Sequence, residues 1–214
     1  MSRLSLFVLC LGLTTSGKGE TADLTFTIYS EALPLQDAVA SLVPLDFNPP
    51  SPASAPIEVV IAQENKEYDP YVTVIRAGTE AMFPNRDNVQ HHLYSVSKPK
   101  RFEKPLYASG TSESVVFEKT GLVTLGCNIH DWMVAYVLVV PTPWFVKTGT
   151  DGVAHLRGLP PGRYQLEVWH PRLSKSESRE VTLMAGENTL EAIRLKLKPD
   201  RRIRRAPTGG SGGY

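Results

Sequence analysis

The sequence predicts an all-β protein made of two β-sandwich units. Between residues 23 and 141, short runs rich in β-branched and aromatic residues are separated by Gly, Pro, Asn and Ser. These runs recur about every 8–12 residues, a spacing typical of antiparallel sandwiches and barrels. The segment Leu35–Leu42 is the one place where a short helix is expected.

Eight strands are predicted in the first unit. The turn chemistry between them is strong, as in Asn48-Pro-Pro-Ser, Arg76-Ala-Gly and Lys119-Thr-Gly. The predicted strands are Leu24–Tyr29, Ile57–Ala62, Val72–Ile75, Glu80–Phe83, His92–Ser97, Ser114–Phe117, Leu122–Gly126 and Met133–Val140.

A second, smaller β unit is predicted after Pro141-Thr-Pro-Trp144. Its turns are marked by Thr148-Gly-Thr-Asp-Gly and Gly158-Leu-Pro-Pro-Gly. A unit of about 57 residues is small for independent stability, so we expect it to pack against the first. Its predicted strands are Val153–Leu156, Arg163–Trp169, Glu180–Leu183 and Asn188–Leu197.

The two ends of the chain predict export and a tail. Residues 1–19 join a positive start, the apolar run Leu4–Leu13 and a small, polar exit, which is the layout of a cleaved signal peptide. The alternative is a buried first strand or helix. Residues 20–141 and 142–198 are then the two domains of a periplasmic protein, and residues 199–214 a disordered, basic, Gly-rich tail.

Charge argues against a nucleic-acid partner, and hydropathy argues against a membrane-spanning segment. The formal net charge is +1, but residues 20–193 hold 14 Lys and Arg against 21 Asp and Glu, a net charge of −7. An acidic body argues against nucleic acid as a partner. No apolar run reaches the roughly 18 residues that span a bilayer, so no integral membrane segment is expected.

Metal-ligating side chains gather in the segment Gly126–Met133. Cys127, His130 and Met133 follow one another at three-residue steps in a short loop between two predicted strands, which can direct all three toward one point. A further imidazole is available at His91 or His92. Neighbouring residues of a strand face opposite sides, so one of the two histidines reaches the loop and the other does not.

This donor set favours copper over other metals. Two imidazoles, one thiolate and one thioether match a trigonal copper site with a long axial methionine. Structural zinc prefers four strong ligands, and one cysteine cannot hold an iron–sulfur cluster. A Cys127–His130 nucleophile is the alternative, but no oxyanion arrangement accompanies it, and Asp131 is the one orienting carboxylate in view.

The loop resembles that of the cupredoxins, the blue copper proteins of the amicyanin and plastocyanin type, and its Cys-x2-His-x2-Met spacing is that of amicyanin in particular. The run Phe83-Pro-Asn-Arg-Asp-Asn-Val-Gln-His-His-Leu is similar to the cupredoxin segment that carries the first histidine ligand, which implies His91. The next residue is usually Asn in that family and is His92 here. The chain also resembles bacterial methylamine utilization proteins, which append an Ig-like, transthyretin-like module related to the carboxypeptidase regulatory domain.

The resemblance implies a cupredoxin-like Greek-key sandwich and an exported type 1 copper protein. Copper would be bound by His91, Cys127, His130 and an axial Met133, and the protein would carry single electrons between a donor and an acceptor redox protein that the sequence does not identify. We expect a monomer without enzymatic activity. The alternative is a non-catalytic copper-binding module in which the ion is stored or stabilises the fold.

Overall fold

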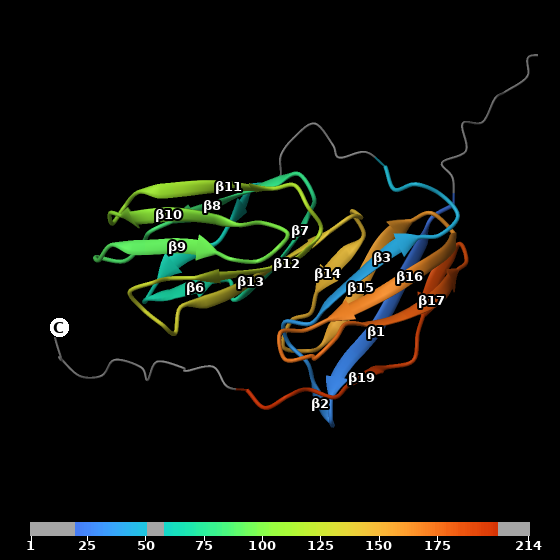
Figure 1. The fold of residues 1–214 in the computed structure, drawn as a ribbon. Helices are drawn as coiled ribbons and strands as arrows, with labels where there is room; N and C mark the ends of the chain where they lie inside the picture. Colours follow the sequence, from blue (N-terminus) through green and yellow to red (C-terminus); the bar gives the residue numbers. More distant parts are fainter. Residues whose placement is uncertain (1–19, 51–57, 201–214) are drawn as a thin grey trace, which may run out of the picture.

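The computed structural model describes residues 20–50 and 58–200. The predicted signal peptide and almost all of the predicted tail lie outside these residues. The described residues form nineteen strands and no helix, so the prediction of an all-β chain is confirmed. Figure 1 shows two β units side by side. We call them the middle unit (β4–β13) and the terminal unit (β1–β3 with β14–β19).

The middle unit is a two-sheet sandwich. One sheet has the order β10-β9-β12-β13-β7 and the other β11-β8-β4, with a separate β5–β6 hairpin. β11 pairs with β8 in the second sheet, and β12 then returns to lie beside β9, which is Greek-key connectivity. The strands are β4 (Val59–Val60), β5 (Ala62–Glu64), β6 (Glu67–Asp69), β7 (Val72–Arg76), β8 (Thr79–Pro84), β9 (His91–Ser95), β10 (Phe102–Tyr107), β11 (Ser112–Phe117), β12 (Gly121–Gly126) and β13 (Val134–Val140).

The terminal unit is a second sandwich, and both ends of the chain build it. One sheet is centred on β1, which pairs with β15, β18, β19 and β2, and the other has the order β14-β3-β16-β17. The strands are β1 (Ala22–Ser30), β2 (Leu33–Pro34), β3 (Val39–Pro44), β14 (Phe145–Lys147), β15 (Val153–Leu159), β16 (Gly162–Trp169), β17 (Glu177–Leu183), β18 (Gly186–Thr189) and β19 (Ile193–Leu195).

The strand predicted at Leu24–Tyr29 therefore forms, but not in the unit where it was expected. As part of β1 it pairs with β15 in antiparallel register and with β18 and β19 in parallel register. Its alternate residues Leu24, Phe26 and Ile28 enter the core of the terminal unit. About 57 residues bury too little surface alone, and the N-terminal strands complete that core.

The predicted helix at Leu35–Leu42 is wrong, because the second half of the segment is strand β3. Ala38, Ala40 and Leu42 face the core of the terminal unit, whereas Val39 faces the middle unit. A strand that is buried on both faces shows no alternation of apolar and polar residues, so its period of two is hidden in the sequence.

Strand β10 was not predicted. It is the edge strand of its sheet and contains Pro105, with Lys104 paired to Glu113 at 2.9 Å. An edge strand tolerates proline and charged side chains, which removes the usual sequence signals of a strand.

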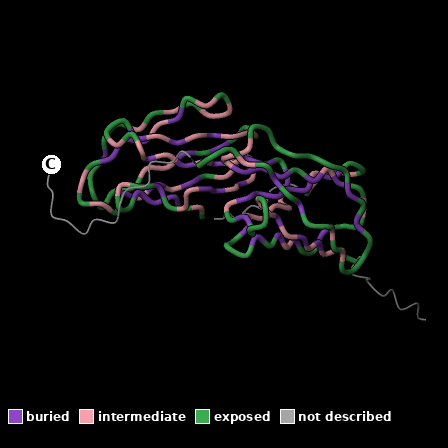
Figure 2. The backbone as a smooth tube through the Cα atoms, turned by 90° about the horizontal axis from the view of Figure 1, so that it is seen from below, coloured by how far each residue is buried: buried purple, intermediate pink, exposed green. Residues whose placement is uncertain are grey.

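Each unit has its own core, and a third apolar cluster joins them. Figure 2 shows buried residues following the strands inside both units. At the junction Val39 and Trp169 of the terminal unit pack with Val72 of the middle unit. The Lys147 Nζ also donates to the carbonyl of Val72 at 2.8 Å. The two sandwiches thus share a packed boundary.

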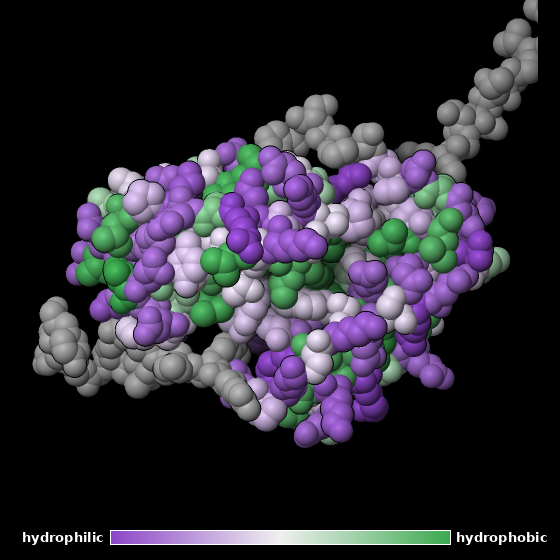
Figure 3. All heavy atoms as spheres, in the orientation of Figure 1, coloured by the Kyte–Doolittle hydropathy of each residue, from purple (hydrophilic) through white to green (hydrophobic). Residues whose placement is uncertain are grey.

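The described residues contain no helix that is long and apolar enough to cross a membrane. On the face drawn in Figure 3, hydrophilic side chains spread over both units, and apolar ones lie in separate areas between them. Scattered apolar side chains of this kind are normal for a protein surface.

Alkaline pH tests the packing of Tyr164 in the terminal unit. Its buried hydroxyl donates to the carbonyl of Pro160 at 2.6 Å, and burial raises its pKa from 10.0 to about 12. The unfolded phenol ionises first as pH rises, so the contribution of Tyr164 to stability is complete below pH 10 and is lost toward pH 12. We predict that between about pH 9 and pH 11 the wild type loses more unfolding free energy in urea than Tyr164→Phe. Equal losses would contradict the assignment.

Candidate metal centre

The loop that carries Cys127, His130 and Met133 is closed by the pairing of β12 with β13. The ladder runs from Gly121 opposite Val139 to Gly126 opposite Val134, so residues 127–133 must turn back within a short distance. The amide of Met133 donates to the carbonyl of His130 at 2.9 Å, which tightens the end of the loop. The loop is therefore compact before any ion binds.

Strand β9 brings His91 to this loop. Ligand atoms of His91, Cys127 and His130 all lie within 4.8 Å of one another. The Cys127 Sγ is 3.9 Å from the His130 Nδ1, and the two imidazole ring centroids are 5.0 Å apart. Three of the four predicted ligands therefore converge, one from β9 and two from the β12–β13 loop, although His91 and Cys127 are 36 residues apart in the sequence.

The two ring nitrogens of His91 differ in their hydrogen bonding. The Nε2 lies 2.7 Å from a carboxylate oxygen of Asp87. The Nδ1 is buried and has no hydrogen-bond partner among the described residues. A buried, unpartnered imidazole nitrogen beside a thiol is unfavourable unless an ion is bound there. The Asp87 contact also matches the carboxylate that commonly orients a metal-binding histidine.

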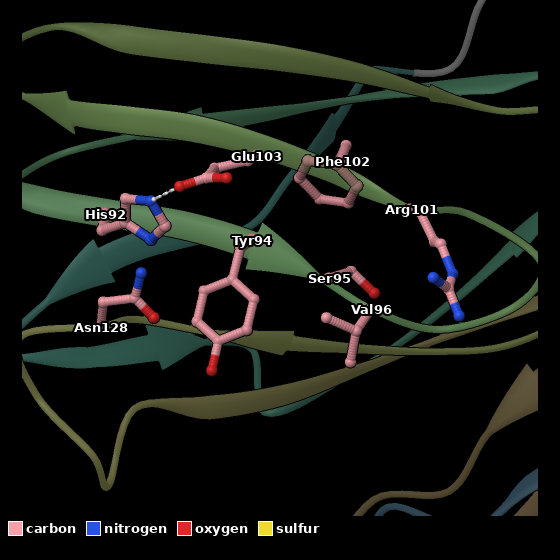
Figure 4. A pocket seen from close by; sticks show the side chains of 8 residues that line it. All are labelled: His92, Tyr94, Ser95, Val96, Arg101, Phe102, Glu103 and Asn128. Atoms are coloured by element: carbon pink, nitrogen blue, oxygen red, sulfur yellow. Dashed lines mark hydrogen bonds and ion pairs between the residues drawn. The ribbon is translucent and has the colours of Figure 1, made fainter.

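His92 faces the other side of β9. Its Nε2 is 2.9 Å from an oxygen of Glu103, and its ring lies beside Tyr94 with centroids 5.5 Å apart. Figure 4 shows this group with Asn128 at a shallow pocket of about 390 Å³. The Nδ1 of His92 is also buried and unpartnered, yet His92 does not belong to the cluster formed by His91, Cys127 and His130. The alternation expected from the strand pleat is thus observed.

The electrostatics favour a thiolate at Cys127. Burial alone raises the pKa of the thiol, but the adjacent His91 ring and hydrogen bonds from nearby backbone amides outweigh burial and lower the pKa. The amides are those of Ile129, His92 and His130. A metal binds the thiolate, so this environment reduces the free energy needed to deprotonate the ligand.

The pKa of His91 shifts in the opposite direction from that of Cys127. Burial lowers its pKa, whereas the adjacent Cys127 thiol and the contact with Asp87 raise it by more, and the pKa is raised overall. In the metal-free protein the imidazole and the thiolate stabilise each other's charged forms. A metal that binds both would displace the protons of the thiol and of the charged imidazole.

Met133 lies in the same buried cluster of the middle unit as Cys127. His91, Cys127 and Met133 are 0%, 4% and 1% exposed, while His130 is half-buried. The site is therefore closed except at the edge of His130.

Tyr68 contacts the backbone on both sides of the candidate centre. Its hydroxyl is 3.0 Å from the carbonyl of Gly126 and 3.2 Å from that of His92, the residues beside Cys127 and His91. Burial raises the pKa of this hydroxyl far above its usual range, so it stays protonated. One buried phenol thus bridges β9, which carries His91, and the end of β12, which Cys127 follows.

Sequence reasoning missed the supporting residues. Asp87 lies in the segment that resembles the first ligand segment of cupredoxins, but the sequence analysis gives it no role. Its position four residues before His91 is the sequence feature that points to it. Trp132 offers no metal-binding atom, so its type gives no sign of a role at the site. In the structure its ring lies 5.3 Å from that of His130, and its Nε1 donates to the carbonyl of Lys66 at 3.0 Å.

Comparisons with known proteins give distant likenesses. No family model matches the sequence, and no curated protein matches it. Among solved structures, the chain is similar to a copper-containing nitrite reductase from Thermus scotoductus, with 24% identity, 45% of this chain covered and a TM-score of 0.39. The match spans 25% of the nitrite reductase, so this chain corresponds to about a quarter of its length.

Two smaller copper proteins are also similar. A purple cupredoxin from Nitrosopumilus maritimus is 27% identical over 39% of this chain and 98% of its own, with a TM-score of 0.34. A variant of amicyanin in its Cu(I) form is 17% identical over 39% of this chain and 82% of its own, with a TM-score of 0.37. The function of this chain is therefore inferred from its own donor atoms.

Proposed function

We propose that this protein is an exported one-electron carrier that binds a single copper ion through His91, Cys127, His130 and Met133. The observation that carries the proposal is the convergence of three strong donors, one of them the buried and unpartnered Nδ1 of His91. The addition of a buried thioether distinguishes this donor set from a structural zinc site. Bound copper would supply one-electron chemistry by cycling between Cu(I) and Cu(II).

The protein's own residues suit electron transfer better than catalysis. The burial of His91, Cys127 and Met133 prevents a substrate from reaching the ligands, and the packed strands around them hold the donors in one arrangement. His130 is the one half-buried ligand, so its ring edge is the proposed exit for an electron. The donor and acceptor are redox proteins, and no enzymatic role is proposed.

The periplasm is the proposed compartment, on the strength of the signal-peptide pattern in residues 1–19, which lie outside the described residues. Cys127 is the one cysteine left after cleavage and is buried, which suits a ligand in an oxidising compartment.

The thiolate assignment is tested by loading the mature protein with Cu(II) and recording its visible spectrum. We expect an intense thiolate-to-copper band in the wild type and none in Cys127→Ala, because the colour requires the sulfur. Reversible one-electron voltammetry should accompany the band. A band that survives Cys127→Ala would overturn the site, and copper that binds without a reversible wave would favour the storage or structural alternative.

The two histidines are separated by single variants. His91→Ala should abolish the band, because it removes a donor that converges on Cys127. His92→Ala should keep the band and reduce copper affinity by at most about 10–100-fold, as for residues beside a ligand. Absorption titrations with Cu(II) measure both. The reverse pattern would make His92 the ligand.

The axial role of Met133 is tested with Met133→Gln. An amide oxygen is a harder donor than a thioether and favours Cu(II), so the variant should keep its colour and show a lower reduction potential. Protein-film voltammetry of the two forms provides the comparison. An unchanged potential would show that Met133 packs near the site without binding the ion.

A further inference from the structure

The β5–β6 hairpin ends in a turn, Asn65–Lys66, that contacts both sides of the candidate centre. Both residues have positive φ, 56° and 58°, the conformation of a type I′ hairpin turn. This conformation is unusual for a lysine, since such turns prefer glycine at the second position. We call these two residues the 65–66 turn.

The first contact of the turn leads to His91. The amide of Asn65 donates to one carboxylate oxygen of Asp87 at 2.7 Å, and the amide of Lys66 donates to the other at 2.8 Å. The second oxygen also lies 2.7 Å from the His91 Nε2. Two backbone amides therefore fix the carboxylate that orients the imidazole.

The second contact leads to His130. The carbonyl of Lys66 accepts a hydrogen bond from the Trp132 Nε1 at 3.0 Å. The Trp132 ring packs against the His130 ring at 5.3 Å, with an angle of 54° between the planes. The same residue, Lys66, thus reaches the second imidazole through Trp132.

We propose that the 65–66 turn positions His91 and His130 together, through Asp87 on one side and Trp132 on the other, and holds them in place in the metal-free protein. All of its contacts are made by backbone groups, so they depend on the shape of the turn and not on its side chains. The identity of the ion rests on the proposed function, whereas the positioning of the two rings does not.

The alternative is that Asp87 and Trp132 act separately, each on its own histidine. The two cases differ in how variants combine. Effects that pass through one shared element are not additive, whereas effects at independent sites multiply in affinity. Asp87→Asn and Trp132→Phe are suitable changes, because the first keeps the size of the side chain and the second keeps an aromatic ring beside His130.

The first measurement uses the copper-free protein, so it does not depend on the metal function. NMR of the imidazole nitrogens and protons should show that Trp132→Phe shifts the signals of His91 as well as His130, and that Asp87→Asn shifts those of His130 as well as His91. Amide hydrogen exchange at Asn65 and Lys66 should also become faster in Trp132→Phe, although neither amide donates to Trp132. This exchange measurement decides the question if Asp87→Asn does not fold.

The second measurement is Cu(II) affinity. Each single variant should lose about 10–100-fold in Cu(II) affinity. The double variant should bind copper about as tightly as the single variant with the larger loss, and not with a loss equal to the product of the two. Lys66→Gly is the matched control. It keeps both backbone groups and suits the positive φ, so it should leave the ring signals and the affinity unchanged.

Signals that move only at the nearer histidine, unchanged exchange at Asn65 and Lys66, or a double variant that loses the full product would overturn the shared positioning. A wild type that binds copper without the thiolate band would overturn the proposed function instead, and the copper-free measurements would still decide whether the turn holds the two rings.

Discussion

The close approach of β9 to the end of β12 is the contact on which the candidate centre depends. It occurs where Tyr94 pairs with Gly126, the residue before Cys127. A Cβ at residue 126 would lie 2.8 Å from the end of the Tyr94 ring, so a larger residue would require that side chain to move. Because His91 is three residues before Tyr94 on the same strand, this pairing brings the first imidazole near the thiol.

The centre in its metal-free form gathers polar atoms that are poorly satisfied. The Nδ1 of His91 is buried without a hydrogen-bond partner among the described residues, and the Cys127 thiol beside it has a lowered pKa. Such an arrangement costs folding free energy, which the surrounding apolar cluster of the middle unit must offset. Binding an ion would satisfy the imidazole and the thiolate together, so metal binding and folding stability are coupled.

The local part of the site was predictable from the sequence, and the supporting part was not. Spacing in one short loop brings Cys127 and His130 together, and the strand pleat separates His91 from His92. The fold class follows from the same short-range patterns. By contrast, the contact between Asp87 and the 65–66 turn joins segments whose proximity depends on the whole sandwich, and backbone donors carry no signature in the sequence.

The same limit explains the errors in the terminal unit. β3 is buried on both faces, so Leu35–Leu42 resembles a helix in sequence. Three of the four partners of β1, the strands β15, β18 and β19, lie more than 120 residues away in the sequence. A pattern within a window of ten residues cannot show which distant strand will complete a sheet.

The terminal unit is made from both ends of the chain, which makes the middle unit an insertion within it. In synthesis from the N-terminus, β1 must wait for β15, β18 and β19 before its sheet can form. The middle unit contains all of its own sheet partners and can fold earlier. A fragment that stops at residue 141 would leave β1 and β3 without their principal partners and expose two apolar strands to aggregation. A self-contained fragment with the candidate centre would instead begin after β3 and end after β13.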